Sequence, residues 1–274
     1  RLIEISVPSG RRLEPIVAHH LGGGFREEVI RDVAEMIGRA TGADVAEIVR
    51  RARRRAQEEA RDLDPKDLEA VILPKDDRPT EQRHAVARHE AAHALLAHRF
   101  GAVVSSVSIV ATGTALGHTE IRWPECLLTR RELETRVVVA LAGRAADVVL
   151  GDGGNAGAID DLGVATRLIA EIHFGAGLGE RLIHLTGGAD PLGLISRDPR
   201  KSEIVEAHLR RSFAEAQRQV EDLHLEIEAL ARCVMERRIL SRDFLYEWFG
   251  RRLVSGTPEK VDKKEFESPG GSRS

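Results

Sequence analysis

The sequence lacks most of the features that identify disulfide-bonded, membrane-spanning or phosphate-binding proteins. Its 274 residues include two cysteines, Cys126 and Cys233, too few for a disulfide framework or a four-thiolate metal site, so we expect a reducing compartment. The longest stretch without Asp, Glu, Lys or Arg, residues 100–119, is interrupted by Ser, Thr and Gly and predicts no membrane span. The sequence has no Gly-Lys dipeptide and therefore no phosphate-binding P-loop.

Aromatic residues and net charge are also scarce. Aromatics make up 4% of the chain, and 41 basic residues against 44 acidic residues leave a net charge of -3, which argues against a general polyanion-binding protein. Residues 50–55 contain five arginines, which suggest either a nucleic-acid surface or a solvated helix face. No aromatic residues lie among them to stack on bases, so we favour the solvated face and expect no nucleic-acid partner.

The chain is expected to have three parts. Residues 1–77 predict a small helical unit that follows a short strand at residues 2–7. A Pro-rich linker at residues 74–79 separates this unit from a larger domain, residues 80–252. Residues 253–274 are rich in Gly, Ser, Pro and Lys and predict a disordered tail. The fold class predicted for the whole is mainly α with a small β-hairpin or sheet.

The larger domain is predicted to combine long helices with one hairpin. Residues 103–110 alternate in the manner of a strand, and a turn at 112–114 leads to a second strand at 116–121. From Val205 to Val234, apolar residues recur at spacings of three and four, which indicates a core-facing helical stripe. The helices are predicted over residues 80–100, 132–150, 158–174 and 202–249. Thr41 and Thr129 begin capping boxes.

The residues that indicate chemistry lie at positions 89–93, where the predicted helix reads His-Glu-Ala-Ala-His. Residues four apart on a helix lie about 40° from each other around its axis, so both imidazoles project to one side and can bind one tetrahedral ion. Glu90 is rotated about 100° from His89, which places its carboxylate beside such an ion, where it can take a proton from water. The pattern predicts a catalytic zinc site.

A histidine-rich surface helix is the alternative interpretation, because His84 and His98 lie on the same segment. Each is five residues from the nearer candidate ligand and about 140° off its face, so neither would join the site. The alanines and leucines at 91–97 predict a buried stretch, where two histidines and a glutamate are costly without partners. A zinc ion supplies a partner, and we therefore favour the metal interpretation.

The third ligand of a catalytic zinc must come from elsewhere in the chain, because position 99, six residues after the second histidine, is Arg. The candidates are Asp147, Asp160 and Asp161. Asp161 shares a helix face with apolar residues, whereas Asp160 shares one with polar residues and is expected to be more exposed. We choose Asp161. Asp147 is the second choice, with an ion pair or a position behind the ligands as its alternative roles.

The Gly-rich loop at residues 151–157 superficially matches the dinucleotide pattern G-x-G-x-x-A. That pattern needs a strand before it, and the residues that precede it predict a helix. We therefore predict no cofactor-binding role for this loop.

Four segments occur in the order in which they occur in a known family. With these segments the chain resembles the peptidase domain of the FtsH-type ATP-dependent zinc metalloproteases. They are residues 89–93, 115–119, 140–147 and 157–166. Residues 1–77 resemble the small helical lid subdomain that ends an AAA ATPase module, through residues 1–8 and 41–44. The chain departs from the family at Ala92, where Gly is usual, and at Asp160, where Asn is usual.

The resemblance implies a role for each candidate residue. It makes His89, His93 and Asp161 the ligands of one Zn²⁺ and Glu90 the catalytic residue. It implies a zinc metalloendopeptidase that degrades unfolded or membrane-extracted polypeptides, with an α-helical peptidase domain over residues 80–252. The runner-up is a catalytically inactive assembly or adaptor module with the same fold.

The resemblance also implies partners. ATP would act only through an AAA ATPase core of the parent protein, whose large nucleotide-binding subdomain is not in this sequence. The assembly implied is a homo-hexamer, and the expected location is the cytoplasm or the cytoplasmic face of a membrane.

Overall fold

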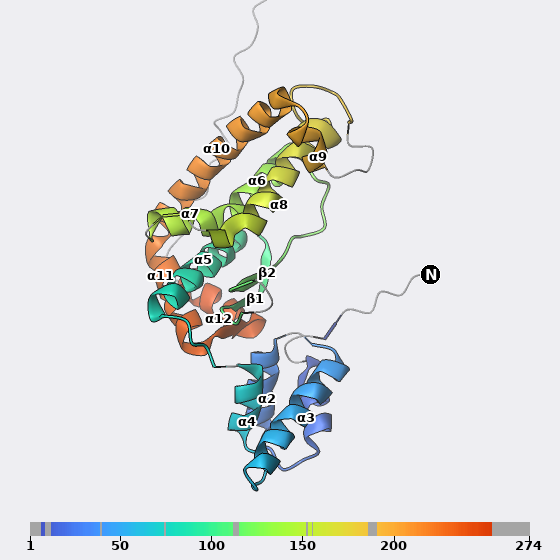
Figure 1. Cartoon of the computed structure of the whole chain (residues 1–274), viewed down its shortest axis with the longest axis vertical. Helices are drawn as coiled ribbons and strands as arrows, with labels where there is room; N and C mark the ends of the chain where they lie inside the picture. Colours follow the sequence, from blue (N-terminus) through green and yellow to red (C-terminus); the bar gives the residue numbers. More distant parts are fainter. Residues whose placement is uncertain are drawn as a thin grey trace, which may run out of the picture.

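The computed structural model describes most of the chain as helices and one small antiparallel sheet, which confirms the mainly α class. Of the predicted strand at residues 2–7, only Val7 is described, and it is not in a strand; the hairpin turn at 112–114 and the predicted tail beyond residue 253 lie outside the described residues. Figure 1 shows a small blue helical unit at one end of an elongated molecule and a larger unit above it. The residues described are 7–8, 12–38, 40–73, 75–111, 115–151, 153–154, 156–185 and 191–253.

The small unit has its own hydrophobic core, which draws on residues 13–72. The capping box predicted at Thr41 is confirmed: the Asp44 amide donates to Thr41 Oγ1 (3.2 Å), and the Thr41 amide donates to Asp44 Oδ2 (2.8 Å). Such reciprocal bonds satisfy two amides that the first helical turn leaves free. The four helices are α1 (Glu14–Leu21), α2 (Glu27–Ile37), α3 (Gly42–Glu58) and α4 (Pro65–Ile72).

The arginine-rich face of α3 takes part in the structure of this unit. The Arg53 guanidinium donates from Nη2 to the carbonyl oxygens of His20 and Leu21, at 3.1 and 2.9 Å, at the end of α1. Arg50 pairs with Glu47 on the same helix. Arg50 and Arg53 thus make contacts within the small unit, and the solvated face stays a prediction for the run as a whole.

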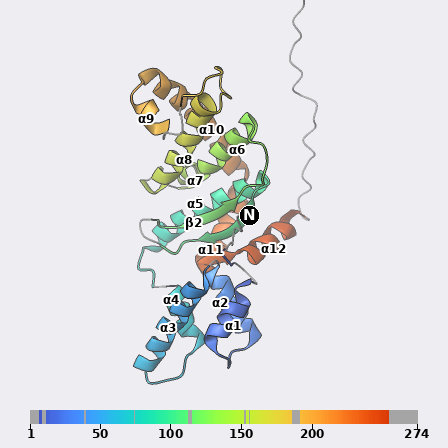
Figure 2. The same ribbon diagram turned by 90° about the vertical axis from the view of Figure 1, so that its right-hand side faces the viewer.

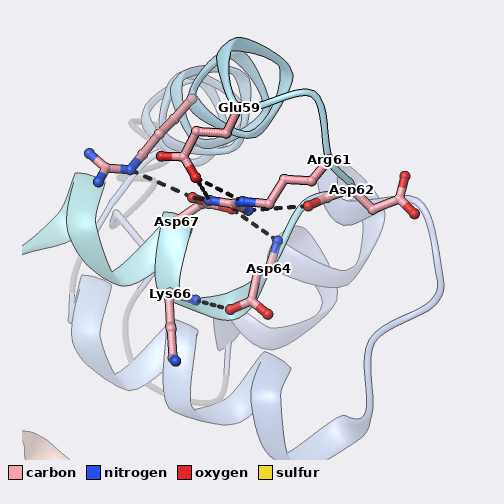
Figure 3. Close-up of polar contacts among 7 residues, drawn as sticks. Glu59, Arg61, Asp62, Asp64, Lys66 and Asp67 are labelled. Carbon is pink, nitrogen blue, oxygen red and sulfur yellow. Dashed lines mark hydrogen bonds and ion pairs between the residues drawn. The ribbon is translucent and has the colours of Figure 1, made fainter.

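A polar cluster joins α3 to α4 (Figure 3). The Asp67 side chain is 1% exposed, and both of its oxygens accept from the Arg61 guanidinium, at 2.6 and 2.8 Å. The Asp64 amide donates to the same carboxylate at 3.0 Å, and Arg61 also pairs with Glu59 at 2.6 Å. The hydrogen bonds from Arg61 lower the pKa of Asp67 to about 2, despite the opposing effect of burial.

The larger unit is built around a second core of residues 87–249. Its central helix ends at Phe100 because Gly101 adopts a left-handed φ of 83°, which lets the Ala102 amide donate back to the Ala97 carbonyl at 2.9 Å. The capping box at Thr129 is also confirmed. The elements are α5 (Thr80–Arg99), β1 (Val103–Ser108), β2 (His118–Arg122), α6 (Arg130–Ala140), α7 (Ala142–Val149), α8 (Ile159–Ala170), α9 (Pro191–Ser196), α10 (Pro199–Asp222), α11 (His224–Arg237), β3 (Ile239–Ser241) and α12 (Arg242–Leu253).

The structure corrects several predicted boundaries. The single helix expected over 132–150 is divided at Leu141 into α6 and α7. The helix expected over 158–174 begins after a short 3-10 turn as α8 and ends in a π-helical turn, Glu171–Gly175. The long helical segment is interrupted by β3, and α9 was not predicted. β3 has three residues, which is too short for a period-two pattern to be recognised.

Helix α5 lies at the centre of the larger unit. It contacts α7 and α11 as well as the strands β1 and β2, and both views show it between the sheet and the other helices (Figures 1 and 2). The sheet has the order β2-β1-β3, and all its pairings are antiparallel. Because α5 is covered on several sides, the side chains of residues 91–97 are all buried. Polar groups on α5 must therefore find partners inside the protein.

Membrane spanning requires a helix that is both long and apolar. Among the described helices, none meets that requirement.

Candidate metal centre

The two histidines of α5 project toward the beginning of α8. The His89 side chain is 12% exposed and that of His93 is 8% exposed. Their rings lie with centroids 4.9 Å apart and an interplanar angle of 65°. The single helical turn between residues 89 and 93 explains this proximity, because positions four apart share one face.

Asp161, in the first turn of α8, completes a triangle of ligand-type atoms. Its Oδ2 lies 2.9 Å from His89 Nε2 and 3.2 Å from His93 Nε2, and the two nitrogens are 3.2 Å apart. These three side chains form the one group of metal-binding type found among the described residues. The structure thus brings together the three residues predicted as ligands, which lie as far apart as 72 positions in the sequence.

The donor set fits a zinc ion. Zinc binds His nitrogen and carboxylate oxygen at roughly 2.0–2.2 Å. All three separations in the triangle are shorter than twice that length, so one ion can touch all three atoms at once. Two imidazoles and one carboxylate also match the composition of catalytic zinc sites, which keep a fourth position open.

The far side of each imidazole is fixed by a second contact. His89 Nδ1 lies 3.1 Å from Asp147 Oδ2, and His93 Nδ1 lies 2.8 Å from the Val139 carbonyl oxygen. Such contacts fix which ring nitrogen carries hydrogen and turn Nε2 toward the shared point. Asp147, the second choice as ligand, therefore lies behind His89 and not beside both rings.

Mutual hydrogen bonds change the pKa values of two members of the triangle. Burial lowers the pKa of His89, but hydrogen bonds to Asp147 and Asp161 outweigh that effect and raise this pKa to about 10. Burial opposes ionisation of Asp161, yet hydrogen bonds from His89 and His93 hold the pKa of its carboxyl well below the usual range. A bound metal ion would compete with protons for these nitrogen and oxygen atoms.

Glu90 lies beside the triangle and is 7% exposed. Its Oε2 accepts a hydrogen bond from the Thr119 hydroxyl at 2.7 Å. Gly117 lies against the same side chain: a Cβ at this position would be 2.8 Å from both Cγ and Oε1 of Glu90. The first residues of β2 and the residue before it therefore line the Glu90 carboxylate.

Gly143 in α7 makes room for His89. A Cβ at position 143 would lie 2.2 Å from His89 Nε2, a distance at which two atoms cannot coexist. Position 143 must therefore be glycine for α7 and α5 to pack this closely. Gly143, Thr119 and the Val139 carbonyl were not predicted as parts of the site. The sequence did offer a signal for two of them, because Gly143 and Thr119 lie in segments 140–147 and 115–119, which resemble the family. No sequence pattern identifies a backbone carbonyl as part of a site.

The other candidates lie away from the triangle. Asp160 is exposed, as its helix face predicted. His84 lies 3.4 Å from Glu228 of α11, and the His98 ring stacks on Phe249 with centroids 3.9 Å apart. The Gly-rich loop follows helix α7 and not a strand, so it does not meet the condition for dinucleotide binding.

Comparisons with known proteins agree with this geometry. Residues 78–247 match the family model described as peptidase family M41. A protein of Sorangium cellulosum named ATP-dependent zinc metalloprotease FtsH 1 is 33% identical over 252 residues, which cover 79% of this chain and 40% of the relative. An ATP-dependent zinc metalloprotease FtsH of Syntrophobacter fumaroxidans is 33% identical over 254 residues, covering 84% and 38%.

A third relative extends the match along the chain. The ATP-dependent zinc metalloprotease FtsH of Thermus thermophilus is 31% identical over 294 aligned positions, covering 94% of this chain and 44% of the relative. The chain therefore spans about two fifths of the length of these curated relatives.

Proposed function

Because this chain belongs to peptidase family M41, we propose that it is the proteolytic part of a zinc-dependent endopeptidase. The observation that carries the proposal is the convergence of His89 Nε2, His93 Nε2 and Asp161 Oδ2 on one point, with the buried Glu90 next to His89 on the same helix. The names of the relatives, which are zinc metalloproteases, support the same conclusion.

In this proposal His89, His93 and Asp161 hold the zinc ion, and Asp147 and the Val139 carbonyl orient the two imidazoles. When bound, zinc supplies a Lewis acid that polarises the scissile carbonyl and makes the attacking water more acidic. The ligand side chains come from two helices, α5 and α8, whose packing fixes the donor geometry.

Glu90 acts as the general base. Thr119 occupies Oε2, which leaves Oε1 as the oxygen that accepts a proton from the attacking water. Glu90 then delivers the proton to the leaving amine, so that hydrolysis ends with the carboxylate restored. Burial of Glu90 and its contact with β2 hold the carboxylate in one orientation, which general-base catalysis requires.

The substrate class we propose is an extended, unfolded or membrane-extracted polypeptide. In the sheet order β2-β1-β3, β2 is an outer strand, and its residue Thr119 contacts Glu90. A substrate strand added to β2 would bind through backbone hydrogen bonds next to the proposed site, with little sequence preference.

We further propose that residues 1–77 are the lid subdomain of an AAA ATPase module, that residues 80–252 are the peptidase domain, and that residues 253–274 form a disordered tail. The separate core of α1–α4 supports the division between the first two parts. In the parent protein an ATPase core would supply ATP dependence, six copies would form the assembly, and the site of action would be the cytoplasm or the cytoplasmic face of a membrane.

The alternative, an inactive assembly or adaptor module of the same fold, is not favoured. Such a module has no need to retain a complete donor set, and this chain keeps three converging ligand atoms and a buried carboxylate beside them.

The test is Glu90→Gln, which removes the base and preserves side-chain size. We expect turnover of an unfolded protein such as casein to fall by about 10²–10⁴-fold, the usual contribution of a general base. Zinc content, measured by elemental analysis, should remain at one ion per chain, because Glu90 is not a ligand. Cleavage at the unaltered rate would remove Glu90 as the base. Wild-type protein that binds zinc and cleaves nothing in any assembly state would favour the inactive module.

A further inference from the structure

Two carbonyl oxygens at the open end of the β1–β2 hairpin accept from a single guanidinium. Arg78, in the linker just before α5, donates from Nη1 to the Leu116 carbonyl at 2.8 Å. Its Nη2 donates to the Ile109 carbonyl. Ile109 follows β1 and Leu116 precedes β2, so the guanidinium connects the two sides of the hairpin where its loop begins and ends.

Asp76 holds this guanidinium in place. Its carboxylate accepts from Arg78 Nε at 2.8 Å and from Nη2 at 2.6 Å, and the Asp76 and Arg78 side chains are 7% and 15% exposed. A bidentate pair of this kind fixes the plane of the guanidinium and aims its remaining donors. We call Asp76, Arg78 and the two carbonyls that Arg78 contacts the Arg78 bridge.

The residues that follow Leu116 contact the proposed base. Gly117 lies against the Glu90 side chain, where a Cβ would come within 2.8 Å, and Thr119 donates to Glu90 Oε2 at 2.7 Å. One carbonyl that the guanidinium holds is thus three residues from the hydroxyl that orients the carboxylate. His118 and Thr119, at the start of β2, pair with Ser108 and Val107 of β1. The bridge lies just beyond that pairing, so it adds a restraint on the residues that lead into β2, which include Gly117.

We propose that Arg78 is a positioning residue for Glu90: by joining the Ile109 and Leu116 carbonyls, it fixes the start of β2 and thereby the Gly117 and Thr119 contacts that orient the carboxylate. The inference rests on the proposed function for its catalytic consequence, but its structural part does not. The competing interpretation is a tether, in which the same residues only hold the small unit to the larger one.

A variant at Arg238 serves as the control that distinguishes the positioning role from the tether. The Arg238 guanidinium reaches the same linker, at the Leu73 carbonyl (3.1 Å) and at Asp76 (3.9 Å), and its side chain makes neither hairpin contact of the Arg78 bridge. Arg238→Lys therefore removes the hydrogen bond to the Leu73 carbonyl, keeps a positive charge near Asp76 and leaves the four contacts of Arg78 in place. Arg78→Lys keeps the charge beside Asp76 but loses the planar fork that spans two carbonyls and a carboxylate.

The first measurement is amide hydrogen exchange of the segment 115–122 in the metal-free chain. We expect exchange about tenfold faster in Arg78→Lys and changed by less than about twofold in Arg238→Lys, because a lost hydrogen bond lowers the local opening free energy only where it acted. Equal acceleration in both variants, or none in Arg78→Lys, would overturn the proposal in favour of a tether.

The second measurement is turnover by the zinc-loaded protein. In Arg78→Lys we expect kcat to fall about three- to tenfold with KM nearly unchanged. The reason is that the variant misorients the Glu90 carboxylate but leaves the binding of the substrate strand unaltered. Thr119→Val should lower kcat similarly, and the double variant should lose less than the product of the two losses, because both act through one strand. For Arg238→Lys combined with Thr119→Val, the fold loss in kcat should equal the product of the losses in the two single variants, because these two residues act independently.

The outcomes keep the two proposals distinct. Altered exchange with an unaltered kcat in Arg78→Lys would overturn the positioning role. A wild-type protein without activity would contradict the proposed function, and the exchange result would then still decide whether Arg78 holds the start of β2.

Discussion

Asp67 in the small unit and Asp161 in the larger one are both carboxylates that face nitrogen donors, but their partners differ in kind. Asp67 is 1% exposed and receives two hydrogen bonds from Arg61, which lies in the connection between α3 and α4 (Figure 3). Asp161 is 29% exposed and faces two imidazole nitrogens that also face each other.

The difference shows why one cluster is structural and the other is a candidate site. A guanidinium is always charged, so the Asp67 pair is complete without any further ion. Imidazoles gain and lose protons near neutral pH, so the His89, His93 and Asp161 cluster must hold either protons or a metal ion. Buried ion pairs by themselves thus do not mark function; convergence of exchangeable donors on one point does.

Exchanging a carboxylate for an amide in each cluster gives the largest contrast. We expect Asp161→Asn to weaken zinc binding by more than about 100-fold, a larger effect than those of residues behind the ligands. Asp67→Asn should leave zinc affinity unchanged, because its partner is Arg61. Competition titration against a chelator of known affinity measures both. Zinc loss in the Asp67 variant would contradict the conclusion that the Asp67 cluster is structural and separate from the metal centre.

The contact behind His89 should have a smaller effect on the metal. Asp147→Asn keeps the shape of the side chain and removes the charge that orients the ring, and we expect zinc affinity to fall by about 10–100-fold. The same titration distinguishes it from the ligand variant. If zinc were lost in the Asp147 variant and retained in the Asp161 variant, the roles of the two carboxylates would be reversed.

Substitutions at two helical glycines of the larger unit test whether α7 packs closely against His89. Gly143→Ala should reduce the free energy of unfolding by about 1–3 kcal/mol and displace His89, because the new Cβ has no room. Gly193→Ala, in α9, meets nothing within 4 Å and should be neutral or stabilising. Thermal unfolding and zinc content measure both. A Gly143 variant of normal stability with full zinc content would refute the close approach of α7 to His89.

The two regions of the metal-free chain should also differ in how their stability depends on pH. The pKa of Asp67 is lowered from 3.8 to about 2, so its stabilisation is complete above pH 4 and is lost as pH falls toward 2, by about 2 kcal/mol at most. The pKa of His89 is raised from 6.5 to about 10, so its stabilisation is complete below pH 6.5 and is lost as pH rises toward 10.

The free energy of unfolding, measured from pH 2 to 10 on the chain freed of metal by a chelator, reports both transitions. Asp67→Asn should remove the acid transition and leave the alkaline one. Added zinc should abolish the alkaline transition, because a bound ion replaces the proton on His89. An alkaline transition that zinc does not affect would show that His89 lies outside the metal centre.

Local patterns predicted the elements that carry the site. The helix that bears His89 and His93, the hairpin after it and both capping boxes follow from spacing and from side-chain hydrogen-bonding capacity, which act within a few residues. The break at Leu141 and the strand β3 did not follow, because both depend on contacts between distant segments: α7 approaches α5, and β3 pairs with β1.

The sequence by itself determined that two imidazoles lie one turn apart on a buried helix with a glutamate beside them, because helical geometry alone fixes those relations. It also favoured Asp161 over Asp147 as the third ligand, from the apolar helix face that Asp161 shares. Only the tertiary structure decided that Asp161 meets both Nε2 atoms and Asp147 meets Nδ1 of His89, because those contacts join positions 72 and 58 residues apart and depend on how α7 and α8 pack on α5. The contacts of Thr119 and Arg78 were decided in the same way, by strand pairing and linker packing that no local pattern encodes.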